Sequence, residues 1–551
     1  MTPISLRSLL VWLMFFSSIY FSCNPIDKSE IIAVYPGMHL ERDKENLLRD
    51  FYSQDQKAVS QWKEYVFEDL ELLKEIMPLD EKYTLWTQDT IVLPRADSVL
   101  ELLKNAQYYG LQPAWYHYQD LKRQRLLLDD SVYKYDPIQW SKFEVLLSNA
   151  FTGFAQDIKY GKMKSDSIDL RENRKFDDNI LLKILTNVRS NQSISSIIQQ
   201  QEPRHEGYHQ IKKLLFAFVP QMDQKKFTTV VFPWQDSLLF LKQLHKRLSE
   251  EGFLDSSILH TDSVKMSQSI KKAQLFYGLH KDGKAGKLMI AALNSWKQAR
   301  YARMAINLDR YRVMPDSLPE SFILVNIPSY SLEARYRDSL VFRSKVIVGK
   351  PRTRSPLLNS VFTNIVVYPQ WNVPESIIFK EIIPKMQSDP HYLRKQNMVV
   401  LDKRDSIIDP ATIHWAKANK KNFRYRIRQG EGLDNSLGII KFNFSNPFSV
   451  YLHDTNARSL FQLEERSLSH GCIRVENWKQ MANYLAAPSI NPVDDPVIMR
   501  LLKAEKKANK NLGFKTYLYI RYFTLFDAGE GLKWYPDIYG EDNQLIDSYL
   551  Y

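Results

Sequence analysis

Two short segments in the last quarter of the chain carry residues that could act together on an acyl group. The first, VYLHDT at 450–455, contains His453, and the second, LSHGCIRV at 468–475, contains His470 and Cys472. A thiol attacks a carbonyl carbon well only as a thiolate, so a neighbouring imidazole must accept its proton or stabilise its charge. The two segments therefore predict nucleophilic catalysis by Cys472, with a histidine as its base.

The residues alone leave both histidines open as that base. His470 lies two positions from Cys472 and would share its side of an extended strand, whereas His453 reaches across from another segment and is freer to address the sulfur. Asp454 is the nearest candidate for orienting the base. An acyl-transfer intermediate also needs N–H donors for its oxyanion. Gly471 lacks a Cβ and lets a substrate approach the main chain, so the N–H groups of Gly471 and Cys472 are the predicted donors.

Two further side chains are candidates for substrate binding. The planar guanidinium of Arg474 suits a carboxylate, although a structural ion pair would explain it equally well. Trp371, in QWNVP, is expected either to line the pocket or to belong to a core. A zinc site made of His453, His470 and Cys472 would lack the closely spaced ligand pairs typical of such sites. We therefore predict no metal and no cofactor.

The other cysteine of the chain, Cys23, follows an apolar N-terminal run. Arg7 precedes the apolar residues 9–21, a run shorter than the roughly 20 residues of a membrane span, so residues 1–23 are predicted to be a secretory signal. Cys23 stands where lipoproteins carry their lipidated cysteine. Ordinary cleavage nearby or an uncleaved anchor would also fit this run. In an exported chain Cys472 would then be a lone thiol, which favours a reactive one.

The net charge of +12 would suit an anionic partner. Lys, Arg, Asp and Glu are interspersed along the chain without a block of like charge, which favours a solvated basic surface. We therefore predict no nucleic-acid partner.

The elements expected around these segments form an α+β protein of several domains, because 551 residues exceed a single core. Residues 41–260 show the amphipathic period of a helical scaffold, and 263–297 show two helical stripes around a turn. Residues 320–505 alternate as strands do, with an insertion at about 371–429 that reads as helical. A further strand and an exposed tail are expected in 506–551.

Residues 263–297 resemble the small three-helix peptidoglycan-binding module. That module has a Gln-x-x-x-Gly-Leu helix, an Asp-Gly-x-x-Gly turn and an Ala-Leu-Asn ending. The matching residues here are Gln274, Gly278, Leu279, Asp282, Gly283, Gly286, Ala292, Leu293 and Asn294. Most of these are core or turn positions, so the match says little about ligands.

His453, followed after fifteen residues by SHGCIR at 469–474, resembles the signature of L,D-transpeptidases, the cysteine enzymes that cross-link peptidoglycan. The segments ILVNIPSYSL, VIVGKPRTRSP, YPQWNVPESI, GLDNSLGIIKFNF and YPDIYGEDNQL are similar to the large, scaffold-carrying branch of this family in Gram-negative envelopes. The resemblance implies a mixed, β-sandwich-like catalytic domain and a location in the periplasm or cell envelope. It also implies Cys472 as nucleophile and His453 as base, with His470 and Gly471 shaping the active-site loop.

The resemblance further implies a reaction in two halves. Cys472 would attack the carbonyl of the third residue of a tetrapeptide stem, usually diaminopimelate, and expel the terminal D-Ala. The thioester would then pass to the side-chain amine of a second stem, giving a 3-3 cross-link. Water as acceptor would make the enzyme an L,D-carboxypeptidase. The sequence is also compatible with a non-catalytic wall-binding scaffold and with a plain cysteine amidase or protease. The expected partners are peptidoglycan stem peptides, with membrane contact through an N-terminal lipid or anchor.

Overall fold

The described part of the chain falls into two compact units. The computed structural model describes residues 39–53, 77, 83–162, 178–222, 227–277, 279–337 and 339–550. The first unit holds the described parts of Met1–Lys104, Pro113–Phe154 and Phe176–Ile197; the second holds those of Asn105–Gln112, Ala155–Lys175 and Ile198–Tyr551. The predicted signal at 1–23, with Cys23, lies outside the described residues. None of the described helices has both the length and the apolar character to cross a membrane.

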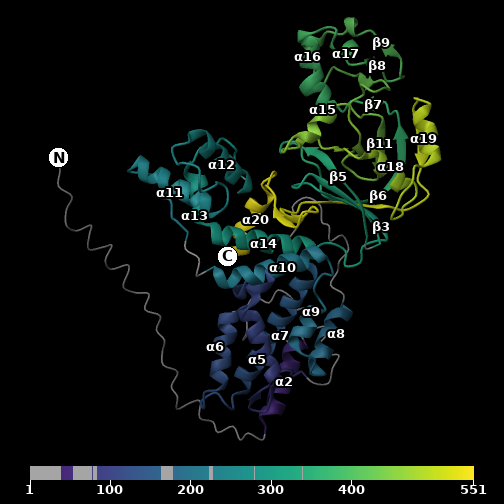
Figure 1. The fold of residues 1–551 in the computed structure, drawn as a ribbon. Helices are drawn as coiled ribbons and strands as arrows, with labels where there is room; N and C mark the ends of the chain where they lie inside the picture. The colour runs from purple at the N-terminus through teal and green to yellow at the C-terminus, as the bar shows by residue number, and fades with distance from the viewer. Residues whose placement is uncertain are drawn as a thin grey trace, which may run out of the picture. The chain divides into compact units, whose positions relative to one another are not determined.

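The first unit is helical, as its amphipathic pattern predicts. Its main helices are α2 (Leu40–Tyr52), α5 (Pro94–Lys104), α6 (Tyr118–Leu128), most of α7 (Pro137–Tyr160) and α8 (Asp178–Arg189), drawn in purple and blue in Figure 1. The buried carboxylate of Glu144 in α7 accepts the main-chain N–H groups of Leu85 at 2.8 Å and Thr87 at 2.6 Å. These bonds join α7 to the hairpin of β1 (Thr87–Gln88) and β2 (Ile91–Val92).

The second unit is built around one mixed sheet. Its strands follow the order β11-β12-β14-β5-β4-β3-β16-β6-β15, with β13 beside β5. β12 and β14, β13 and β5, and β16 and β3 pair in parallel, and the remaining neighbours pair antiparallel. The bounds are β3 Ser321–Asn326, β4 Ser331–Tyr336, β5 Ser339–Gly349, β6 Leu358–Val367, β11 Ile440–Phe444, β12 Leu452–His453, β13 Ser467–Ser469, β14 Ile473–Val475, β15 Ala508–Asn511 and β16 Tyr517–Arg521.

The sheet closes on itself, because β6 pairs with β11 as well as with β16. The mixed, β-sandwich-like domain that the family resemblance implies is therefore one continuous mixed sheet around a common interior. Alternate residues of its strands fill that interior, among them Ile323, Val325, Leu452 and Ile473, all at most 1% exposed. Helix α18 (Trp478–Ala486) packs against the same core.

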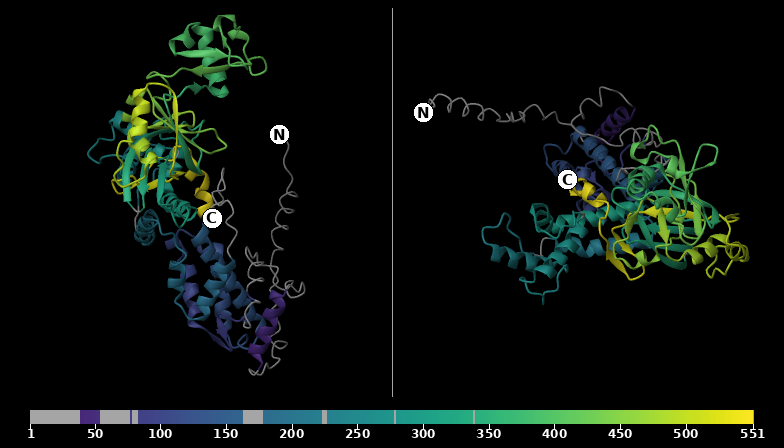
Figure 2. Two further views of the ribbon diagram at one scale, coloured as in Figure 1. Left: turned by 90° about the vertical axis from the view of Figure 1, so that its right-hand side faces the viewer. Right: turned by 90° about the horizontal axis from the view of Figure 1, so that it is seen from above.

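The insertion at 371–429 is a small domain with strands of its own, which its helical pattern did not predict. Its sheet has the order β7-β10-β8-β9, from Trp371–Asn372, Arg426–Gln429, Met398–Leu401 and Ile407–Ile408. Its helical segments are α15 (Glu375–Ile377), η5 (Ile378–Ile382), α16 (Ile383–Ser388) and α17 (Tyr392–Lys395), and they share a separate core with these strands. Figure 2 shows the insertion as a lobe of its own, and Trp371 pairs with Gln429 where the chain enters and leaves it.

The three-helix region contains α12 (Ser263–Phe276), α13 (Lys287–Asn294) and α14 (Trp296–Arg312). Gln274 donates to Asp282 at 2.7 Å and accepts the N–H of Gly283 at 2.8 Å, so these residues fix the turn. The third helix extends well past the predicted boundary at 297. Within the second unit, Arg303 of α14 is buried and donates to Asp542 at 2.8 Å.

The further strand expected in the C-terminal segment is present as β16, whereas the expectation of an exposed tail was wrong. β16 lies inside the sheet between β3 and β6. The following segment includes β17 (Leu525–Asp527), β18 (Leu532–Trp534) and α20 (Glu541–Leu550). Asp537, Tyr539 and Asp542 are all less than 5% exposed. Buried partners for their polar atoms, such as Arg303 for Asp542, make this burial possible.

Candidate active site

Three neighbouring strands bring the predicted catalytic residues together. In β11, β12 and β14, Lys441 lies opposite His453, and His453 lies opposite Arg474. One step back along β12 and β14, the N–H of Ile473 donates to the carbonyl of Tyr451 at 3.1 Å, which sets Tyr451 beside Cys472.

Because side chains alternate along a strand, these residues share one face of the sheet. Leu452 and Ile473 point to the opposite face, into the core. The alternation that fills the interior therefore leaves a patch of Lys441, His453, Arg474, Tyr451 and Cys472 on the outer side. His453 is the diagonal neighbour of Cys472 across the parallel pair of β12 and β14. The register thus places these two residues on one face of neighbouring strands, and their pairing as base and nucleophile stays a prediction.

Burial and the residues around Cys472 shift the pKa of its thiol in opposite directions. Cys472 is a free cysteine of intermediate exposure. Burial raises its pKa, while the main-chain N–H and the hydroxyl of Tyr451, and the charges of Lys441 and Arg474, act to lower it. The pKa remains above its ordinary value. The raised pKa favours a resting thiol over a thiolate near neutral pH.

His453 is neutral in the same site. It is 4% exposed, and burial together with the charge of Arg474 lowers its pKa to about 3. The main chain at Asp454 and Leu437 partly opposes this shift, although the buried Nδ1 makes no hydrogen bond of normal geometry with a described group. A neutral imidazole can accept the thiol proton during attack, so a neutral pair is compatible with general-base catalysis.

Asp454 does not orient His453 through its side chain. Its carboxylate accepts from the N–H of Ile439 at 3.2 Å and from Arg458 at 2.7 Å. Asp454 directly follows β12, and none of these side-chain bonds goes to the imidazole. Its contribution to His453 comes through the main chain.

His470 contacts the insertion. Its Nε2 lies 2.5 Å from a carboxylate oxygen of Glu381 in η5. Trp371, at the entry to the insertion, reaches the Tyr451 hydroxyl with its side chain. Both residues thus connect the insertion to the neighbourhood of Cys472. Trp371 also packs against the core of the insertion, so the structure fits both of its sequence-based interpretations.

The loop before Cys472 uses one of the two predicted oxyanion donors internally. The N–H of Gly471 donates to Ser469 Oγ at 3.1 Å, and that hydroxyl donates to the carbonyl of Cys472 at 2.6 Å. Among the described residues, no group accepts the N–H of Cys472. The N–H of Cys472 is therefore the better oxyanion donor, and Gly471 contributes its conformation, with φ at +121°.

Arg474 has no carboxylate partner within the described part of the chain. Its Nη1 lies 3.4 Å from the Thr455 hydroxyl, and its buried Nε has no hydrogen-bond partner there. The structural ion pair considered from the sequence is thus not formed with any described residue. Arg474 remains a candidate for binding a carboxylate.

Sequence reasoning missed Lys441 and Tyr451. Lys441 Nζ lies 3.9 Å from the centre of the Tyr451 ring, and that ring lies 5.6 Å from the ring of His453. Burial lowers the pKa of Lys441. The signal for Tyr451 was available, since it stands two residues before His453 on one strand. The place of Lys441 beside this site could not be predicted, because it depends on the register between strands that the sequence does not reveal.

Replacing Lys441 by methionine is expected to slow alkylation of Cys472 by iodoacetamide about 3- to 10-fold near neutral pH. Removing the cation raises the thiol pKa, and below that pKa each unit of increase removes about tenfold of the thiolate. The rate of alkylation against pH measures this directly. Lys441→Arg keeps the charge and should restore most of the rate. An unchanged profile in Lys441→Met would show that the ammonium does not influence the sulfur.

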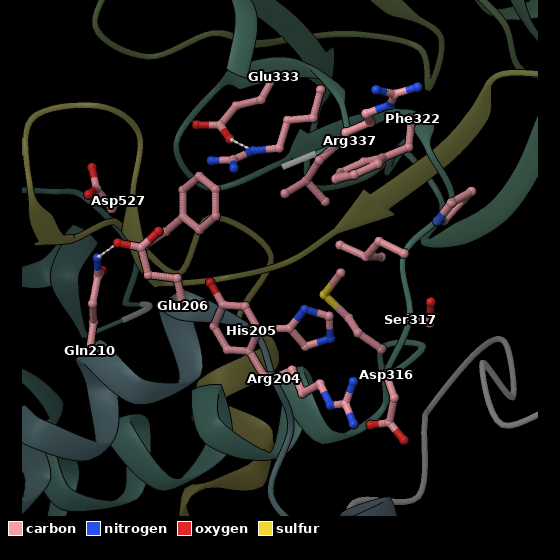
Figure 3. A pocket seen from close by; sticks show the side chains of 18 of the residues that line it. Arg204, His205, Glu206, Gln210, Asp316, Ser317, Phe322, Glu333, Arg337 and Asp527 are labelled. Atoms are coloured by element: carbon pink, nitrogen blue, oxygen red, sulfur yellow. Dashed lines mark hydrogen bonds and ion pairs between the residues drawn. The ribbon is translucent and has the colours of Figure 1, made fainter. Parts of the chain in front are cut away.

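A separate pocket of about 870 Å³ lies on the outer face of β3 and β4, next to α10 (Glu206–Phe218). Figure 3 shows Gln210 bonded to Glu206 and an ion pair at Glu333, whose carboxylate binds Arg335 and Arg343. None of the predicted site residues lines this pocket. Over the described residues, no group of three or more metal-binding side chains occurs either.

Comparisons with known proteins match two parts of the chain to known domains. Residues 320–499 match the family model described as the L,D-transpeptidase catalytic domain, and 79–215 match a scaffold domain. A protein of Haemophilus influenzae named "Putative L,D-transpeptidase" is 38% identical over 244 residues, covering 44% of this chain and 48% of the relative. The chain thus spans about half the length of this relative.

An L,D-transpeptidase from Mycobacterium smegmatis has 13% identity over 37% of this chain and 58% of its own, with a TM-score of 0.16, which is too low to support an argument. Residues 320–499 are thus similar to L,D-transpeptidase catalytic domains, and residues 79–215 to a scaffold domain. The family resemblance read from the sequence is thereby confirmed. The peptidoglycan-binding module at 263–297 stays a prediction.

Proposed function

We propose that the protein is an exported L,D-transpeptidase that forms 3-3 cross-links in peptidoglycan through a thioester on Cys472. The observation that carries this proposal is the strand register within the matched domain. It sets the Cys472 thiol on one face of a sheet with His453, Tyr451, Lys441 and Arg474. A wall-binding scaffold without catalysis would have no need of this arrangement.

The first half-reaction begins from a neutral thiol and a neutral imidazole. Cys472 attacks the carbonyl carbon of the third stem residue while its proton passes to His453. The N–H of Cys472 stabilises the oxyanion. As the intermediate collapses, the C–N bond to the terminal D-Ala breaks, and His453 returns the proton to the leaving amine. Lys441 and Tyr451 stabilise the negative charge on sulfur during proton transfer.

In the second half-reaction, the side-chain amine of a diaminopimelate in another stem attacks the thioester. His453 accepts the proton lost by this amine and returns it to the sulfur, which leaves as the free thiol. Arg474 binds a carboxylate of the donor stem, because it is a guanidinium without a described acidic partner. Trp371, His470 and Gly471 shape the entry to the site. No metal or cofactor takes part in this sequence of steps.

The deciding experiment incubates the purified protein with disaccharide-tetrapeptides and determines product masses. Dimers that have lost one D-Ala are expected. Tripeptides alone would instead assign L,D-carboxypeptidase activity, and cleavage of peptides without D-centres would assign a general cysteine amidase or protease. Unchanged substrate with folded protein would favour the non-catalytic scaffold.

Export to the periplasm or cell envelope is the matching proposal for the N-terminus. It rests on the apolar run followed by Cys23. A lipidated Cys23 would anchor the enzyme to a membrane beside its substrate. The mass of the first peptide of the mature protein distinguishes lipidation from simple cleavage and from an uncleaved anchor.

A further inference from the structure

The carbonyl of Gly471, next to the nucleophile, is held by a buried serine. Ser355 Oγ donates to this carbonyl at 2.7 Å, and the same hydroxyl accepts the N–H of Gly349 at 3.0 Å. Ser355 is 3% exposed. Its hydroxyl oxygen therefore already accepts one hydrogen bond from the main chain, and its proton points at the carbonyl of Gly471.

Ser355 is itself fixed by Tyr539 from the C-terminal segment. The Tyr539 hydroxyl accepts the N–H of Ser355 at 3.1 Å and donates to the carbonyl of Gly349 at 2.7 Å. The N–H of Tyr539 in turn donates to the Tyr522 hydroxyl at 2.7 Å. Tyr539 is 4% exposed, so this contact is well shielded from water.

The loop that carries Ser355 has little freedom to move. A Cβ on Gly349 would collide with the main chain of Thr353 and Ser355, so the loop folds directly over that glycine. The carbonyl of Ser469 accepts from the N–H of Lys350 at 3.0 Å and from the hydroxyl of Thr353 at 3.1 Å. The loop at 349–355 is therefore hydrogen-bonded to the turn before Cys472 through the carbonyls of Ser469 and Gly471.

The carbonyl of Gly471 and the N–H of Cys472 belong to the same peptide group. A trans peptide is planar, so its C=O and N–H point in opposite directions. Glycine permits backbone conformations closed to most residues, and Gly471 sits at φ +121°. Glycine removes the steric limit on the Gly471 side of this peptide group, and the group turned over would aim the carbonyl, not the N–H, at a developing oxyanion.

We propose that Ser355, oriented by Tyr539, is a positioning residue that keeps the Gly471–Cys472 peptide turned with its N–H toward the oxyanion. This inference rests on the proposed acyl transfer at Cys472. Neither side chain touches the substrate. Each acts through the orientation of one peptide group, so the effect falls on reactions that pass through an oxyanion and spares those that do not.

Two reagents distinguish reactions that pass through an oxyanion from those that do not, in the full-length protein. A carbapenem acylates a thiolate through a tetrahedral oxyanion, whereas iodoacetamide alkylates it by direct displacement. Ser355→Ala is expected to slow carbapenem acylation of Cys472 about 10-fold, less than the loss of a direct oxyanion donor. Its alkylation rate should stay within about 2-fold of the wild type. Both rates are followed by the mass of the intact protein.

Ser344→Ala is the matched control. Ser344 lies on β5 and, like Ser355, is buried. It accepts the N–H of Asn477 at 2.9 Å and donates to the carbonyl of Lys345 at 2.9 Å, but does not contact the loop before Cys472. Both of its rates should equal those of the wild type. If Ser355→Ala does not fold, Tyr539→Phe provides the same contrast with a smaller effect.

Two results would overturn the inference in a wild type that acylates. One is acylation of Ser355→Ala, or of Tyr539→Phe in its place, at the wild-type rate. The second is an equal fall of acylation and alkylation, which would mean that the serine merely keeps the loop folded. A wild type that alkylates at Cys472 but never acylates would instead refute the proposed function itself.

Discussion

Replacing Cys472 by alanine should abolish both cross-linking of tetrapeptide stems and acylation by a carbapenem, a loss of roughly 10⁴-fold or more. No second described side chain on this face of the sheet can form a thioester. The hydroxyl of Tyr451 is a poor substitute, because burial and the neighbouring thiol raise its pKa far above neutrality. Product analysis by mass measures the first activity, and the mass of the intact protein measures the second.

The fold should survive this substitution. Removing a partly exposed sulfur leaves the core residues Leu452 and Ile473 in place, so thermal unfolding should shift little. Binding to isolated peptidoglycan should persist in Cys472→Ala, which separates a loss of chemistry from a loss of substrate. Dimers still formed by this variant would show that the nucleophile lies elsewhere.

The side-by-side placement of the segments that carry His453 and Cys472 could be predicted because it depends on local sequence. Each residue stands within a short apolar alternation, and the segment between them is too short to place their strands far apart. The loop contacts of Gly471 were not predictable in the same way. Ser355 lies more than a hundred residues earlier in the sequence, and only the packing of the closed sheet brings it to the glycine carbonyl.

The charge state of the pair was also beyond the sequence. A cysteine and a histidine in proximity suggest an ion pair, but their pKa values depend on how much water reaches them. His453 is nearly fully buried, and the cation of Arg474 on the adjacent strand adds to the penalty for protonating it. The same two residue types on an exposed loop would titrate differently.

The prediction for the C-terminal segment failed for a related reason. YPDIYGEDNQL is polar and rich in turn-forming residues, a composition typical of exposed loops. In the structure Asp542 pairs with Arg303 and Arg310 of α14, and Asp537 accepts from the Tyr522 hydroxyl at 2.6 Å. Buried polar groups of this kind are compensated by partners that are distant in sequence, which a local pattern does not reveal.

Replacing His453 by glutamine is expected to slow carbapenem acylation about 10³-fold, within the usual range for loss of a general base. Alkylation by iodoacetamide should change much less. A neutral histidine does not hold the sulfur as an anion at rest, so its removal leaves the small equilibrium fraction of thiolate nearly intact. Measuring both rates in one variant therefore separates a base that acts during attack from a partner in a standing ion pair.

The alkylation rate of the wild-type protein as a function of pH also tests whether Cys472 and His453 are neutral or charged at rest. His453 has a pKa of about 3, so between about pH 5 and 8 it stays neutral and adds no step to the profile. The pKa of Cys472 is raised by burial, so thiolate, and with it the alkylation rate, should rise about tenfold per pH unit throughout this range. A thiolate–imidazolium pair would instead give a plateau, because the sulfur would already be ionised near neutrality. Such a plateau, lost in His453→Gln, would mean that the imidazole is charged at rest and that substrate meets a preformed nucleophile.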